Sequence, residues 1–183
     1  MERLFEKRLS GETVYDGRII RVERDIVGLP NGGRSVREIV RHGGGVCVAA
    51  LDEQNNVFMV RQFRYAFGRV LDELPAGKLE HGEDPDPAAL RELEEETGYT
   101  ADRMEKLAVS YPSPGYTAEQ LHLYLARGLR FVGQHLDADE FLDVYRLPLD
   151  EAVRRVESGD ICDAKSQTLL LLAARRVAEE ARQ

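Results

Sequence analysis

The segment 77–98 constrains this chain most, because it places six glutamates within 22 positions and closes on a glycine. Its residues predict a helix: Asp86 is a good N-cap, Pro87 suits the first helical position, and Gly98 suits a left-handed C-cap. Between these ends, small and apolar residues recur at helical spacing and form a stripe suited to packing on a sheet. The stripe consists of Ala89, Leu90, Leu93 and Thr97.

An acidic face lies beside this stripe. Glu92, Glu95 and Glu96 have i, i+3, i+4 spacing and therefore share one side of the helix. Like charges at this spacing destabilise a helix by about 0.2–0.5 kcal/mol per pair, and Arg91 offers the nearby compensation. Two interpretations are open on spacing alone: a solvated acidic surface, or oxygen ligands of the kind that Mg²⁺ and Mn²⁺ prefer. The preceding loop favours the second, since Glu83 lies among turn residues and adds a fourth carboxylate.

These residues resemble a known pattern, the Nudix box. The glycines, the arginine, the four glutamates and the apolar positions of the box all occur with its spacing over residues 77–99. The resemblance implies an α/β (α+β) fold, the Nudix α/β/α sandwich with a mixed sheet, and hydrolysis of a nucleoside diphosphate linked to another moiety. The pattern reads Gly77, five residues, Glu83, seven residues, then Arg91-Glu92-Leu93-x-Glu95-Glu96-x-Gly98-Tyr99.

Flanking residues are similar to the ADP-ribose pyrophosphatase branch of that family. The resemblance covers residues 10–175, and the branch markers are less specific than the box, because sugar-nucleotide hydrolases share several of them. The markers are Glu73-Leu74-Pro75-Ala76-Gly77-Lys78, Ser113-Pro114-Gly115, Arg61-Gln62-Phe63-Arg64 and Glu119-x-x-His122-x-Tyr124.

Length and composition set broad limits. A chain of 183 residues with 43% hydrophobic content can bury one sizeable core. We expect no membrane span, because no apolar run approaches the necessary length, and the charged residues 1–8 do not resemble a signal sequence. Two cysteines are too few for a disulfide framework, so a cytoplasmic protein is expected. The net charge of −8 argues against sequence-independent nucleic-acid binding but permits a phosphorylated ligand that arrives with divalent cations.

Turn signals divide the chain into strands and helices. The sequence of residues 1–42 predicts a thin antiparallel β segment that must pack against another part of the protein or a second subunit. We expect this segment to serve in dimerisation. Residues 43–183 are expected to form the Nudix domain, with a nearly continuous apolar strand at 45–51 in the centre of its sheet. The other expected strands are 13–20, 21–29, 35–42, 57–64, 107–111, 121–126 and 141–147, and the later helices are 148–157 and 167–181, the last with a leucine face at 169–172.

The resemblance implies roles for the residues of the box. Glu92 and Glu96 are the firmest metal ligands, Glu95 shares their cluster, and the backbone carbonyl of Ala76 is a further ligand. Glu83 is expected to join a ligand through water or to orient the loop. Arg91 cannot bind a metal and is expected to hold Glu83 or a neighbouring carboxylate in place.

A later loop is implied to supply a further carboxylate. Glu140 is the candidate, as a metal ligand or as a catalytic glutamate. Some relatives carry another glutamate two residues earlier, where this chain has Ala138. The identity of the general base therefore stays open among Asp137, Asp139, Glu140 and water activated by the metal without a side-chain base.

Several residues outside the box are candidate substrate contacts. Arg37 and Glu38 end the N-terminal segment, which in this branch crosses to a second subunit; a solvent-facing ion pair is the alternative. Arg61 and Arg64 lie on one strand, and we expect both to point to the same face, where they suit phosphate oxygens or form a surface pair.

The resemblance predicts a Mg²⁺- or Mn²⁺-dependent hydrolase that cleaves ADP-ribose to AMP and ribose 5-phosphate, with two or three ions per site. Glu119 follows the Pro114 turn and suits a ribose hydroxyl. Other nucleotide sugars such as GDP-mannose are an alternative, because the box binds the pyrophosphate and not its flanks. A non-catalytic module that senses ADP-ribose is a second alternative, against which the intact box glutamates argue. A homodimer is expected from the family.

Overall fold

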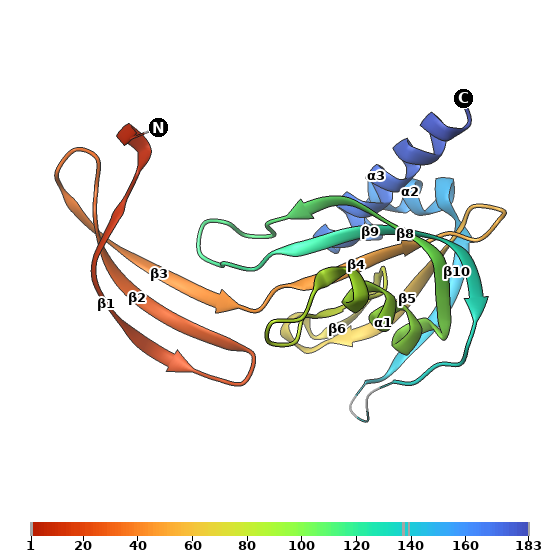
Figure 1. Cartoon of the computed structure of the whole chain (residues 1–183), viewed down its shortest axis with the longest axis horizontal. Coiled ribbons are helices and arrows are strands. Elements are labelled where there is room, and N and C mark those ends of the chain that lie inside the picture. Colours follow the sequence, from red (N-terminus) through yellow and green to blue (C-terminus); the bar gives the residue numbers. More distant parts are fainter. Residues whose placement is uncertain (1, 137, 139, 183) are drawn as a thin grey trace. The chain divides into compact units, whose positions relative to one another are not determined.

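The computed structural model of this protein describes residues 2–136, 138 and 140–182. The chain divides into two compact units, Met1–Gly44 with Tyr111–Gln120, and Gly45–Ser110 with Leu121–Gln183. Each unit has its own strand pairing, and the three α-helices all belong to the second unit (Figure 1).

The first unit is an antiparallel sheet in the order β1-β2-β3. The prediction of three strands is confirmed, but β1 ends earlier than expected, because the Gly17 amide donates to the Ile20 carbonyl at 3.0 Å and closes a turn there. β1 is exposed along its whole length, so this sheet has little core of its own. The elements are a 3₁₀ turn at Glu2–Leu4, β1 (Lys7–Asp16), β2 (Ile20–Gly28) and β3 (Arg34–His42).

The segment Tyr111–Gln120 belongs to this first unit, although it lies far along the chain. The Val40 amide of β3 donates to the Tyr116 carbonyl at 2.8 Å, and the Ala118 amide donates back to the Val40 carbonyl at 2.9 Å. The loop is thereby attached to β3 as a short parallel bridge.

The second unit holds two further sheets. The larger is mixed, in the order β7-β4-β9-β8, because β4 runs parallel to β9 and antiparallel to β7. The smaller is antiparallel, in the order β10-β5-β6. The strands are β4 (Gly45–Ala50), β5 (Asn56–Arg64), β6 (Arg69–Glu73), β7 (Ala76–Lys78), β8 (Tyr99–Ser110), β9 (Leu121–Phe131) and β10 (Leu142–Pro148), with a 3₁₀ turn at Tyr65–Phe67.

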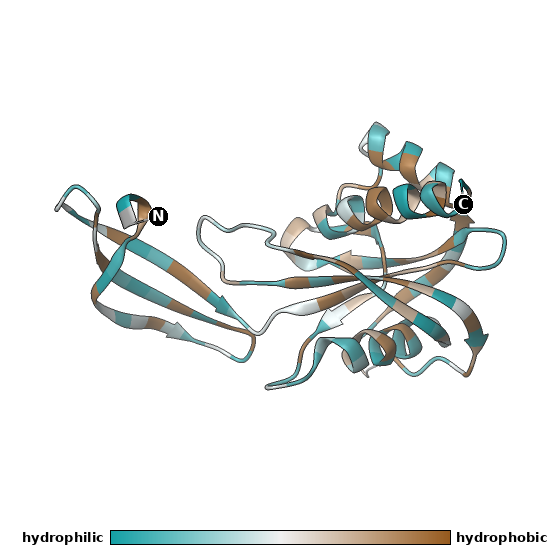
Figure 2. Cartoon of the chain, turned by 45° about the horizontal axis from the view of Figure 1, so that its top comes forward, coloured by the Kyte–Doolittle hydropathy of each residue, from teal (hydrophilic) through white to brown (hydrophobic). Residues whose placement is uncertain are grey.

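Helices cover both faces of β4, and every residue of this strand is buried. Its side chains alternate between two cores: one includes α1 (Pro85–Thr97), and the other includes α2 (Leu149–Ser158) and α3 (Ala164–Glu180). Figure 2 shows α1 and α3 on opposite sides of the strands of this unit. The predicted α/β/α sandwich with a mixed sheet is therefore confirmed.

The last helix corrects one prediction. Leu169 and Leu170 of α3 are fully buried, but Leu171 is 47% exposed, so the expected leucine face is wrong at that position. Four consecutive residues spread over most of a helix circumference and cannot share one face. Among the residues that the structure describes, no helix combines the length and the apolar character that crossing a bilayer requires.

Candidate active site

The acidic helix α1 begins two residues earlier than predicted. Asp84, and not Asp86, is the N-cap: its side chain accepts a hydrogen bond from the Asp86 amide at 3.0 Å, and Pro85 takes the first helical position. The Asp86 carboxylate is used elsewhere, since it accepts a hydrogen bond from the Tyr124 hydroxyl at 2.6 Å. The predicted C-cap is confirmed, with Gly98 at φ 76°.

Two glutamates of α1 turn inward. Glu92 and Glu96 are buried, at 9% and 3% exposure, whereas the Glu95 side chain is 38% exposed. The Ala76 amide donates to Glu96 Oε2 at 2.9 Å. Gly77 packs so closely on the other carboxylate that a β-carbon there would lie 1.8–2.1 Å from the Glu92 carboxylate atoms. Strand β7 and α1 thus form one cradle around the two buried carboxylates.

Burial dominates the electrostatics of this cradle. Loss of hydration raises the pKa of Glu92 to about 7, against the opposing charge of Arg91, and the negative charges of Glu95 and Glu140 add to the rise. Burial likewise raises the pKa of Glu96 to about 8, although the Ala76 amide opposes it. The protein therefore spends folding free energy to keep two carboxyl groups where a bound cation would favour their ionised form.

Arg91 occupies the outer side of the acidic cluster. Its guanidinium donates to both oxygens of Glu83, at 3.0 and 3.1 Å, and to Glu95 at 2.7 Å, and it lies 3.0 Å from Glu92. The hydrogen bond from Arg91, with one from the Glu80 amide, lowers the pKa of Glu83. Arg91 thus holds together the three carboxylates that are less buried than Glu96.

The donor atoms of this cradle fit a magnesium-type cation. Glu92, Glu96 and the Ala76 backbone offer oxygen ligands only, which suits Mg²⁺ or Mn²⁺ and not zinc. Over residues 2–136, 138 and 140–182, no three His, Cys, Asp or Glu side chains gather closely enough to enclose an ion by themselves. A Mg²⁺ ion in a protein usually keeps several waters and uses one or two carboxylates together with substrate phosphates.

The loop after β9 brings Glu140 toward the cradle. The Gln134 side chain donates to the Glu96 carbonyl at 2.5 Å, and the His135 amide donates to the Glu95 carbonyl at 3.2 Å, so the loop is fastened to the end of α1. Glu140 is exposed, and its charge raises the pKa of both Glu92 and Glu96. The other candidate bases, Asp137 and Asp139, lie outside the described residues.

The two arginines of β5 do not share a face, which corrects the prediction. Arg61 pairs with Asp72 at 2.8 Å and lies over the Tyr145 ring, 5.1 Å from its centroid. Arg64 instead forms two hydrogen bonds of 2.6 Å with the carboxylate of Glu73. Positions three apart on a strand point to opposite faces, since side chains alternate with a period of two.

Four predicted substrate residues belong to the first unit, whereas the acidic helix belongs to the second unit. Arg37, Glu38 and Pro114 line one surface pocket of about 270 Å³ with the residues that follow Pro114. The Arg37 guanidinium is already held by both carboxylate oxygens of Glu6, at 2.9 and 2.6 Å. Glu119 lies 3.7 Å from the His42 ring nitrogen. Their roles toward substrate stay predictions.

A buried carboxylate beside the cradle, Glu73, has no role predicted from the sequence. Glu73, treated only as a branch marker, is 1% exposed and receives Arg64 and Lys165. The one signal in the sequence is a charged residue between a predicted strand and the Pro75 turn, and spacing alone does not identify Lys165, which is 92 residues away.

Comparisons with known proteins show similarity over most of the chain. Residues 41–166 match the NUDIX domain, and residues 6–40 match the nucleoside diphosphate sugar hydrolase N-terminal domain. An ADP-ribose pyrophosphatase of Bacillus subtilis (strain 168) is 45% identical over 168 residues, which cover 91% of both chains. A methanol dehydrogenase activator of Bacillus methanolicus is 47% identical over 169 residues, again 91% of both. A solved ADP compounds hydrolase, 23% identical, shares the fold with a TM-score of 0.86 over 97% of both chains.

Proposed function

Because this chain belongs to the Nudix family of hydrolases, we propose that it uses Mg²⁺ or Mn²⁺ to cleave the pyrophosphate of ADP-ribose into AMP and ribose 5-phosphate. The observation that carries the proposal is the burial of Glu92 and Glu96 against the backbone of Ala76 and Gly77. The similarity to an ADP-ribose pyrophosphatase over 91% of the chain supports this substrate before other nucleotide sugars.

Metal binding is assigned to the cradle. Glu92, Glu96 and the Ala76 carbonyl would hold the ions, with Glu95 and Glu140 as further carboxylates whose charges act on this pair and with two or three ions during turnover. When bound, divalent cations neutralise charge on the pyrophosphate and lower the pKa of the attacking water.

The protein's own side chains orient these groups and accept a proton. Arg91 keeps Glu83 and Glu95 fixed at the edge of the cradle, which limits their freedom to turn away from the ions. The water oxygen forms a bond to one phosphorus, the bond from that phosphorus to the bridging oxygen breaks, the other phosphate leaves with the bridging oxygen, and one water proton is released. Glu140 is the described carboxylate best suited to accept it, because it is exposed and its charge reaches both buried glutamates. Asp137, Asp139 and water activated by the metal without a side-chain base stay alternatives.

Substrate contacts outside the cradle fall into two groups. Arg64 is proposed to bind phosphate oxygens with the N–H groups that Glu73 does not use, and Arg61, on the opposite face of β5, is proposed only as a separate substrate contact. In the first unit, three pocket residues and Glu119, which lies beside His42, are proposed to bind the nucleoside or ribose portion. The pocket residues are Arg37, Glu38 and Pro114.

A homodimer and a cytoplasmic location belong to the same proposal. The first unit exposes large apolar side chains on a sheet that has little core, which supports its use as an interface. Examples are Leu9, Val14, Tyr15 and Val36. Sedimentation velocity at micromolar concentration tests the dimer, and a monomeric boundary would remove it. Cell fractionation tests the location.

A substrate panel tests the reaction itself. With Mg²⁺ present, ADP-ribose should be hydrolysed faster than GDP-mannose, ADP-glucose, NADH, diadenosine polyphosphates and 8-oxo-dGTP, with AMP as the product. A faster rate on GDP-mannose would move the assignment to another nucleotide sugar, and equal rates on triphosphates would defeat it. Tight binding of ADP-ribose without turnover would favour the sensing module.

A further inference from the structure

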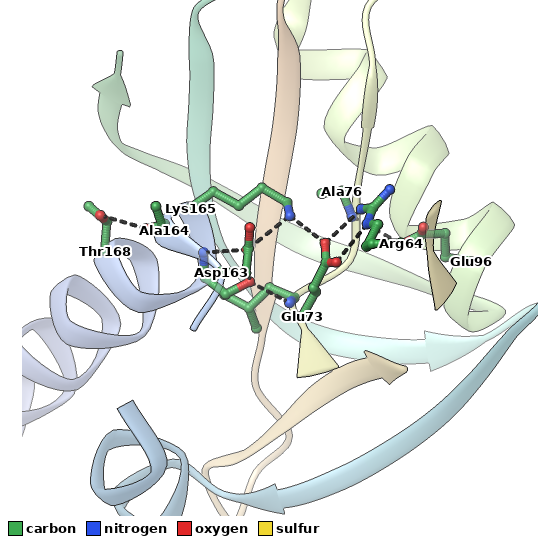
Figure 3. Close-up of polar contacts among 10 residues, drawn as sticks. Arg64, Glu73, Ala76, Glu96, Asp163, Ala164, Lys165 and Thr168 are labelled. Carbon is green, nitrogen blue, oxygen red and sulfur yellow. Dashed lines mark hydrogen bonds and ion pairs between the residues drawn. The ribbon is translucent and has the colours of Figure 1, made fainter. Parts of the chain in front are cut away.

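A buried group of charges lies between α3 and the strand that leads to the cradle (Figure 3). The Glu73 carboxylate is 1% exposed and is shared by two cations: Arg64 donates to both of its oxygens at 2.6 Å, and Lys165 Nζ donates at 2.5 Å. Lys165 also donates to Asp163 at 2.9 Å. We name these residues, together with Ser166, the Glu73 network.

The first turn of α3 is also hydrogen-bonded to the backbone that follows β6. Asp163 caps the helix by accepting hydrogen bonds from the Ser166 amide at 3.0 Å and from its hydroxyl at 2.6 Å. That hydroxyl, fully buried, accepts a hydrogen bond from the Leu74 amide at 2.8 Å. One serine side chain therefore connects the cap of α3 to the chain that enters the metal cradle.

Only one residue separates Leu74 from Ala76, whose carbonyl is the proposed ligand. The Pro75 carbonyl accepts a hydrogen bond from the Val48 amide at 2.9 Å, and the Ala76 amide donates to Glu96 at 2.9 Å. The chain that directly precedes the Ala76 carbonyl is therefore held by Ser166 on one side and by Glu96 on the other. Figure 3 shows Lys165 between Asp163 and Glu73, Arg64 bound to the Glu73 carboxylate, and the hydrogen bond from Ala76 to Glu96 as a separate contact.

The charges of the Glu73 network indicate that it orients neighbouring groups. They do not indicate that it adds net stability or changes the electrostatic field at the cradle. The positive charges of Arg64 and Lys165 are balanced by the negative charges of Glu73 and Asp163. Buried ion pairs often contribute little net stability, because desolvation offsets their attraction. Their geometry is nevertheless demanding, which makes such a group suited to fixing a nearby backbone and a guanidinium.

We propose that Lys165 and Ser166 are positioning residues of the active site. They hold Glu73 and Leu74, and through them they set the direction of the Ala76 carbonyl and of the Arg64 guanidinium. The proposal rests on the proposed function, since it takes Ala76 as a metal ligand. It adds that the first turn of α3, which contributes no ligand, determines the metal affinity of the cradle.

Mn²⁺ binding to the full-length protein without substrate gives the direct test. Free Mn²⁺ measured by electron paramagnetic resonance should show that Lys165→Met and Ser166→Ala raise the dissociation constant by about tenfold or more, as loss of groups that orient ligands does. Lys165→Arg keeps the cation and should restore most of the affinity. Ser166→Ala removes a single hydroxyl and serves if Lys165→Met does not fold.

Arg127→Met is the matched control. Arg127 is a partly buried cation of the same unit, paired with Glu180 at 2.9 Å and with Asn55 at 3.1 Å, outside the Glu73 network. It should bind Mn²⁺ as the wild type does, and circular dichroism in EDTA should show every compared variant folded. Turnover provides a second readout: Lys165→Met should lower kcat at saturating ADP-ribose and raise the Mn²⁺ concentration for half activation.

The outcomes separate the two proposals. Wild-type Mn²⁺ affinity in both Lys165→Met and Ser166→Ala would overturn the positioning role while leaving the proposed function intact. An equal loss in Arg127→Met would also overturn it, because general destabilisation would then explain the effect. If the wild-type protein binds no Mn²⁺, the proposed function is overturned first. If it binds Mn²⁺ but does not hydrolyse ADP-ribose, only the substrate assignment is overturned.

Discussion

Gly77 lies directly against the Glu92 carboxylate: a β-carbon added to Gly77 would lie 1.8 Å from Glu92 Cδ. No relaxed side-chain contact is that short, so any other residue at 77 must move either β7 or the glutamate. The neighbouring Ala76 amide holds Glu96 at 2.9 Å. The spacing between β7 and α1 is therefore set by contacts with both buried carboxylates.

Gly77→Ala tests this close approach. We expect about a 100-fold loss of kcat/KM for ADP-ribose, because a displacement of about 1 Å in a catalytic group costs that much. Mn²⁺ affinity should fall with it. Gly28→Ala is the control, since its β-carbon would meet only Leu9 at the ordinary contact distance of 3.7 Å. Wild-type Mn²⁺ affinity in Gly77→Ala would show that the cradle adapts.

Asp84→Ala tests the start of α1. Loss of the N-cap should lower the free energy of unfolding by about 1 kcal/mol, as such substitutions do in other helices. Asp84→Asn should be nearly neutral, because asparagine caps as well as aspartate. Urea denaturation with EDTA present measures both variants. If Asp84→Ala were neutral as well, the cap assignment would be wrong.

Local sequence was enough to predict the helix and the central strand. The glutamates of α1, its C-cap at Gly98 and the apolar run of β4 depend on near neighbours, and periodicity reports such relations directly. The N-cap was predicted wrongly because two Asp-Pro pairs are locally equivalent. The contact that distinguishes them, from Tyr124 to Asp86, spans 38 residues.

The contacts that the sequence did not predict join residues that are far apart in the chain. Glu73 and Lys165 are 92 residues apart, and so are Leu74 and Ser166. Neither pair follows from composition or spacing, because strand order and helix placement bring them together. The close approach of Gly77 to Glu92 also depends on the packing of β7 against α1. In the sequence, Gly77 is only the first glycine of the box pattern.

Glu96→Gln tests the metal assignment with minimal change of shape. Removing the negative charge of this ligand should lower the rate of Mg²⁺-dependent hydrolysis by at least about 100-fold. Even the loss of a residue that only orients a metal ligand lowers activity by about 10- to 100-fold. The fold should persist, because the amide oxygen can still accept from the Ala76 amide. Circular dichroism and the hydrolysis rate are measured together. Full turnover in this variant would refute the assignment.

The stability of the metal-free protein should depend on pH through the same pair. The pKa of Glu92 is raised to about 7 and that of Glu96 to about 8 from the ordinary 4.5, so the folded state favours their protonated forms. Their contribution to stability is then fully present below pH 4.5 and is lost as the pH rises through 7 and 8. The unfolding free energy in EDTA should therefore fall by several kcal/mol as the pH rises from 4.5 to 8.

Mg²⁺ provides the counter-experiment to this pH dependence. Because a bound cation favours the ionised carboxylates, saturating Mg²⁺ should restore stability most at pH 8 and least at pH 5. The double variant Glu92→Gln with Glu96→Gln should lose both the slope in EDTA and the response to Mg²⁺. A slope that survives in the double variant would assign the pH dependence to other groups, and the cradle would then not be the place where burial opposes charge.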